Sequence, residues 1–142
     1  MNTAISAKDE RNIVFNGKSH ENFFYSMLIK WDNYDVYHQA LAYCLGINED
    51  VRRNINRIYD SETGCINPKC LQEGWITSGS ARVLRIAFNL YCNGTPSVDD
   101  SGTYDERLKE AAKYAVDDLF CCSYARYFWE AIKLRYPEFC NG

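Results

Sequence analysis

Apolar side chains recur every three or four residues along most of the chain, which is the spacing of one face of an α-helix. Together with capping and stop residues, this pattern predicts six helices, at about residues 19–31, 35–45, 48–59, 78–92, 103–119 and 123–136. A short extended segment is expected at Ile13–Phe15, and residues 1–12 are expected to form a flexible arm. The fold class predicted is all-α, a compact bundle of about six helices in a single domain covering residues 1–142.

Polar caps and breakers set the expected ends of these helices. Asp35 is expected to cap the second helix, and Ser78 or Ser80 the fourth, because their side-chain oxygens can accept from free backbone N–H groups. Gly46 is expected to end the second helix in the left-handed conformation. Pro137 is expected to stop the sixth.

The periodicity disappears between Asp60 and Thr77, where Gly64, Pro68 and Gly74 interrupt the chain. We expect a long ordered loop between helices three and four that has no regular structure of its own. Long loops without low-complexity composition are often functional. This loop is therefore a candidate part of a site.

The fourth predicted helix is apolar around most of its circumference, so it is expected to be central. Its apolar residues are Val83, Leu84, Ile86, Ala87, Phe88, Leu90 and Tyr91. A single polar stripe interrupts them, because Ser78, Arg82, Arg85 and Asn89 are separated by four, three and four residues.

The start of this helix is the strongest candidate for a ligand site. Backbone amides at a helix start attract anions, a glycine lets a ligand approach, and arginine binds phosphate or carboxylate through two hydrogen bonds. The predicted ligand-binding residues are Thr77, Ser78, Gly79, Ser80, Arg82, Arg85 and Asn89. The alternative is a serine cap with two arginines paired to acidic residues of neighbouring helices. Neither a Walker motif nor a dinucleotide-binding fingerprint is present.

The cysteines also suggest a metal site or a thiol site, which we regard as alternatives. The candidate ligands are Cys65, Cys70, Cys121, Cys122 and Cys140, with His20 or His38. Structural zinc usually needs more than one closely spaced pair, so no metal and no cofactor are expected. A cysteine nucleophile would need one of the two histidines as its base. Both histidines are better explained as surface or structural residues, and Asp60 and Glu62 as solvated carboxylates.

Composition narrows the class of protein. Of the 142 residues, 46% are hydrophobic and 25% charged, an ordinary globular balance. The net charge of −3 argues against nucleic acid as a partner. No apolar run approaches the roughly 20 residues that cross a bilayer, so no membrane association is expected. Seven cysteines, an odd number, and a polar start without a secretory signal favour a reducing, cytoplasmic setting.

Several motifs are distinctive together. They are the run from Cys65 to Trp75, the Thr-Ser-Gly-Ser at 77–80, the Leu-Phe-Cys-Cys at 119–122 and the stretch from Tyr127 to Glu138. They resemble an uncharacterised family of small proteins from Firmicutes and their phages. Small phage proteins without an enzyme signature are often inhibitors of bacterial defence, so the resemblance implies such a setting.

The leading hypothesis is therefore a noncatalytic binding protein. Its specific form would be an inhibitor of bacterial defence that is encoded by a phage or a mobile element. Its partner would be a host defence protein or a small anionic, nucleotide-like ligand, in the bacterial host cytoplasm, and a homo-oligomer is possible. The alternatives are a small metal- or thiol-dependent enzyme that uses Cys65, Cys70 and a histidine, and a structural interaction module with an aromatic-rich surface.

Overall fold

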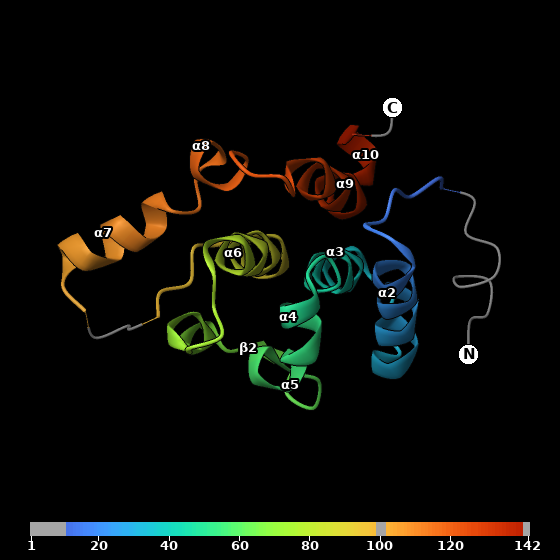
Figure 1. Cartoon of the computed structure of the whole chain (residues 1–142), viewed down its shortest axis with the longest axis horizontal. Coiled ribbons are helices and arrows are strands. Elements are labelled where there is room, and N and C mark those ends of the chain that lie inside the picture. The colour runs from blue at the N-terminus through green and yellow to red at the C-terminus, as the bar shows by residue number, and fades with distance from the viewer. Residues whose placement is uncertain (1–10, 99–101, 141–142) are drawn as a thin grey trace.

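The computed structural model describes residues 11–98 and 102–140, so most of the arm expected at residues 1–12 lies outside these ranges. The fold is mainly α-helical (Figure 1). The helices are α2 (Lys18–Trp31), α3 (Val36–Leu45), α4 (Glu49–Arg53), α5 (Ile55–Ile58), α6 (Ser78–Cys92), α7 (Tyr104–Ala112), α8 (Val116–Leu119), α9 (Ala125–Arg135) and α10 (Pro137–Cys140). A hairpin of β1 (Tyr59–Asp60) and β2 (Cys65–Ile66) and the 3₁₀-helix η1 (Pro68–Gln72) lie between α5 and α6. Within the described residues, none of the helices has the length and apolar character that spanning a bilayer requires.

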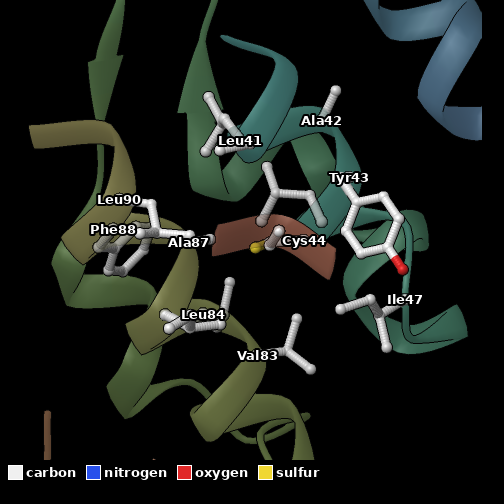
Figure 2. Close-up of a cluster of buried hydrophobic side chains, with 14 of the residues drawn as sticks. Leu41, Ala42, Tyr43, Cys44, Ile47, Val83, Leu84, Ala87, Phe88 and Leu90 are labelled. Carbon is white, nitrogen blue, oxygen red and sulfur yellow. The ribbon is translucent and has the colours of Figure 1, made fainter. Parts of the chain in front are cut away.

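The core forms around α3, which packs against α2, α6 and α9 (Figure 1). Residues 40–45 of α3 are all fully buried, so this helix is enclosed on every side along its second half. Figure 2 shows the facing side chains of α3 and α6, with Cys44 between Tyr43 and the labelled residues of α6. The expectation that residues 78–92 form a central helix agrees with this packing, because α6 also contacts α4, α8, α9 and η1.

Two of the six predicted helices are divided in the structure. The helix predicted at 48–59 breaks at Asn54, whose side-chain Nδ2 donates to the Asp50 carbonyl at 2.8 Å. The helix predicted at 103–119 is α7 and α8, with Tyr114 between them. Tyr114 is buried, and its hydroxyl donates to the Pro96 carbonyl at 2.8 Å. Both breaks depend on contacts with distant residues or on side-chain geometry, which helical spacing does not show.

The expectation of an irregular loop at residues 60–77 is wrong. Tyr59 pairs with Ile66 and Asp60 with Cys65 in the antiparallel hairpin, and η1 follows directly. Strands of two residues and a single 3₁₀ turn are too short to produce a recognisable hydrophobic period.

The predicted ends of the helices are partly correct. Asp35 caps α3, because its carboxylate accepts from the His38 backbone N–H at 2.8 Å. Gly46 is not left-handed, since its φ is −87°. Pro137 does follow the end of α9, but it begins α10 instead of terminating helical structure. The cap of α6 is Thr77, and neither of the two predicted serines takes that position.

Candidate functional site

Backbone N–H groups at the start of α6 are hydrogen-bonded by the side chains of Thr77 and Ser80. Thr77 Oγ1 accepts from the Ser80 backbone N–H at 3.1 Å, and Ser80 Oγ accepts from the Thr77 N–H at 2.7 Å. This reciprocal capping box uses two of the amides that an anion would need. Packing also explains the glycine at position 79, because a Cβ there would lie 3.3 Å from Cε2 of Tyr124. The predicted residues at 77–80 therefore form a helix cap against Tyr124, and Ser78 is exposed beside it.

The polar stripe of α6 faces the chain near Gly94 and near Asp118. Arg82 Nε donates to the Asp118 carbonyl at 2.8 Å, which fastens α8 to α6. Asn89 Nδ2 donates to the Gly94 carbonyl at 2.7 Å, which fastens the start of the next loop. The stripe predicted from the spacing is therefore present, and these two members of it bind backbone carbonyls.

Arg85 occupies the middle of this stripe and lines a cavity of about 170 Å³. The other lining residues come from η1, from the loop after α6 and from the end of α7. They are Leu71, Gln72, Pro96, Val98, Glu110, Lys113 and Tyr114. Gln72 and Lys113 are exposed, so a solute can reach the cavity from solvent. The segment 60–77 contributes Leu71 and Gln72 of η1 to the lining of this cavity.

The charges of this cavity favour an anion. Within residues 11–98 and 102–140, neither the Arg85 guanidinium nor the Lys113 ammonium makes a hydrogen bond or an ion pair. The third charged group is Glu110, whose Oε2 accepts from the Val98 backbone N–H at 2.8 Å. Two cations and one carboxylate leave a net positive charge around the cavity.

Two long-range hydrogen bonds fix the walls of the cavity. The Glu110–Val98 bond and the Tyr114–Pro96 bond join the end of α7 to the loop after α6. Burial raises the pKa of Tyr114, and the opposing effect of nearby Arg85 is smaller. The Tyr114 hydroxyl therefore stays protonated near neutral pH and serves as a donor to the backbone.

The sequence missed Glu110, Lys113 and Tyr114 because one continuous helix was expected there. Their spacing carried a usable signal. They lie at positions i, i+3 and i+4, on a side of the helix different from the apolar stripe of Tyr104 and Leu108. The usable part of that signal is Tyr114, because a large aromatic side chain is buried more often than a charged one.

Among the residues that the structure describes, no cysteine makes a hydrogen bond with a histidine. Cys70 is fully buried in η1, and burial, with a smaller contribution from Glu73, raises its pKa to about 12. Cys65 is exposed, and its Sγ donates to the Thr63 carbonyl. In the part of the chain that the structure describes, no group of three or more His, Cys, Asp or Glu side chains is arranged to hold a metal ion.

The two histidines have different structural roles. His20 is fully buried, so of the two roles expected for it, surface or structural, it has the structural one. Its Nδ1 accepts from the Asn16 backbone N–H at 2.8 Å, so Nε2 carries the proton and donates to the Tyr43 carbonyl at 2.7 Å. A neutral imidazole in the core is the result, and burial lowers its pKa to about 4.

His38 lies in a chain of polar contacts that the sequence did not reveal. Its Nδ1 is 2.9 Å from Asp35 Oδ1, and its Nε2 is 2.9 Å from the Tyr59 hydroxyl. Burial acts to raise the pKa of Asp35, but hydrogen bonds from the His38 backbone and ring outweigh it and lower that pKa. A carboxylate–histidine–hydroxyl chain is the arrangement of a general base. Here the hydroxyl belongs to a side chain that is 7% exposed, so the chain fastens β1 to α3.

Comparison with known proteins yields one match. A family model described as "Family of unknown function (DUF6075)" matches residues 10–142, which include every residue that lines the Arg85 cavity. No curated protein and no solved structure matches the chain.

Proposed function

Because the chain belongs to DUF6075, a family of unknown function, we propose its role from its own geometry: it is a noncatalytic binding protein for a small anion. The anion binds in the Arg85 cavity. The observation that carries the proposal is the Arg85 guanidinium, which lies half-buried in a cavity without a hydrogen-bond or ion-pair partner among the described residues.

Other buried or half-buried arginines have the hydrogen-bond partners that Arg85 lacks among the described residues. Arg135 donates from Nε to the Leu90 carbonyl at 2.8 Å and from Nη2 to Asn93 Oδ1 at 2.7 Å. Arg82 and Arg52 also donate to backbone carbonyls, at 2.8 and 2.7 Å. Partly desolvated charges are costly unless they are paired. A bound anion would supply the partner that Arg85 lacks.

The size of the cavity limits the ligand class. At about 170 Å³ it is smaller than the 300–1,000 Å³ typical of pockets for drug-sized molecules. We therefore propose that it takes a phosphate group or a similar oxyanion, with any larger part of the ligand outside. The lining offers guanidinium, ammonium and amide donors to an anion, and its one carboxylate, Glu110, is held by the Val98 N–H, which favours binding.

The wider setting that we propose follows from the resemblance to small proteins of Firmicutes and their phages. A chain of residues 1–142 that acts as one domain in the bacterial cytoplasm could block host defence by sequestering a phosphorylated signal. Direct binding to a defence protein is the other route. Plating efficiency of phage on defended cells that express the wild type or Arg85→Gln separates the two, because only sequestration needs Arg85.

Isothermal titration calorimetry with inorganic phosphate and pyrophosphate tests the site itself. We expect saturable binding that Arg85→Gln weakens by about tenfold or more, the effect of losing one charge-assisted hydrogen bond. Arg53→Gln is the matched control, since Arg53 is exposed and paired with Glu49 on α4. If the wild type binds neither probe, or if both variants lose binding equally, the Arg85 site is wrong.

A further inference from the structure

We propose that α7 is the contact surface of a two-fold dimer, in which the α7 helices of two copies of this chain pair antiparallel. The proposal does not depend on the anion site, because it uses a different face of the helix. It rests on an exposed apolar stripe and on a pattern of charge beside that stripe.

The apolar stripe of α7 is largely exposed, and it borders an open groove whose other side is formed by Thr95 and Ser97. No residue of α7 is buried, and the helix lies at one end of the long axis of the molecule, away from the core (Figure 1). Tyr104 is 69% exposed and Leu108 is 49% exposed. They share one face with Ala111 and Ala112, at the i, i+4, i+7 and i+8 spacing of a helix that packs against another. Amphipathic helices gain most of their stability from packing of that face.

The charges beside the stripe indicate what covers it. Asp105 lies in the first turn of α7 and Lys109 lies one turn later on the same flank. Neither side chain makes an ion pair with the described residues. In an antiparallel pair, Asp105 of each copy lies beside Lys109 of the other, which gives two equivalent ion pairs. In a parallel pair this flank of one copy lies on the opposite side of the contact from the same flank of the other, so neither ion pair forms and the pattern favours the antiparallel arrangement.

The sizes of the side chains fit the same arrangement. An antiparallel pair centred near Arg107 places Tyr104 of one copy beside Ala111 of the other. A large ring then packs against a small side chain, twice, with the two Leu108 side chains near the centre. A surface that is complementary to itself in both charge and size is what a two-fold contact requires.

The anion site remains available in this dimer. Glu110 lines the Arg85 cavity, whereas Tyr104 and Leu108 line a separate groove beside Thr95 and Ser97. The helix has nine residues and is about 13.5 Å long at a rise of 1.5 Å per residue. A contact of that length is small, so we expect a dimer whose population depends on protein concentration.

Sedimentation velocity of the full chain over a hundredfold range of concentration tests the proposal. We expect a monomer–dimer equilibrium for the wild type. Leu108→Ser should raise the dimer dissociation constant by about tenfold or more, because it removes the central apolar contact. Phe139→Ser is the matched control, because Phe139 is 81% exposed on α10 and should leave the equilibrium unchanged.

Charge exchange gives a sharper test. Asp105→Lys and Lys109→Asp should each weaken self-association about fivefold, since each puts like charges together. An equimolar mixture of the two variants should form heterodimers at the wild-type level, because the heterodimer again has two ion pairs, one with the wild-type polarity and one reversed. A wild type that stays monomeric, or a dimer that Phe139→Ser weakens and Leu108→Ser does not, overturns the proposal.

Discussion

Gly46 and His20 are packed so closely that no side chain fits at position 46. A Cβ there would lie 2.7 Å from Cδ2 of His20 and 2.9 Å from Cδ1 of Phe23. The backbone of Gly46 is in the right-handed helical region, which every residue adopts easily. Glycine is therefore required at this position by the approach of α2 to the end of α3 and not by an unusual backbone conformation.

Gly46→Ala should lower the free energy of unfolding by about 1–3 kcal/mol, the usual cost of adding a carbon to a filled core. Urea denaturation measures the change. In a His20→Ala background the same substitution should cost less, because the nearest atom has been removed. If the cost of Gly46→Ala is the same in both backgrounds, the contact with His20 is not its cause.

Stability should fall as the pH drops from about 6.5 to about 4, because His20 resists protonation in the folded state. Burial lowers its pKa to about 4 from a value of 6.5. Between these values the unfolded chain binds more protons than the folded chain, so the free energy of unfolding decreases as pH falls. The full effect is at most about 3 kcal/mol.

Urea denaturation of the wild type and His20→Gln between pH 7 and pH 4 isolates this contribution. His20→Gln should be less stable at pH 7, but the difference between the two proteins should shrink as the pH falls. A difference that stays constant over this range would show that His20 titrates alike in the folded and unfolded chains.

Cysteine labelling should divide the thiols into two groups. Cys44 and Cys70 are fully buried, and burial raises the pKa of both, so the native protein should protect them from a thiol reagent at pH 8. Cys65 and Cys121 are exposed and should be labelled within minutes. Peptide mass spectrometry of the labelled chain identifies each site. Rapid labelling of Cys70 would contradict this prediction and would support a reactive thiol in η1.

The sequence predicted the helices whose apolar faces lie in the core, because burial and helical spacing coincide there. The helices α2, α3, α6 and α9 match predicted ranges to within a few residues. The breaks at Asn54 and Tyr114 could not be predicted in this way. Each break depends on a hydrogen bond to a backbone carbonyl, Asp50 for Asn54 and Pro96 for Tyr114, and not on a change in apolar spacing.

The candidate site was predicted only in part for the same reason. Arg85 was visible as a polar interruption of an apolar helix, which is a local signal. Glu110, Lys113 and Gln72 join it only through the path of the chain between η1 and α7. The sequence pattern at residues 77–80 predicted an anion site. A capping box and packing against Tyr124 also explain why these residue types occur there.

Glu110→Gln should strengthen binding of phosphate in the Arg85 cavity. The amide oxygen of glutamine can still accept from the Val98 N–H, so the wall of the cavity is kept while its negative charge is removed. Loss of a carboxylate beside a bound anion is worth about 1 kcal/mol in a partly solvated site, or roughly fivefold in affinity. Isothermal titration calorimetry at low and high salt measures the gain, which should shrink as ionic strength rises. Glu106→Gln is the matched control on the same helix, because Glu106 is exposed and accepts from Thr103 outside the cavity. An equal gain in both variants would assign the effect to net charge and not to the cavity.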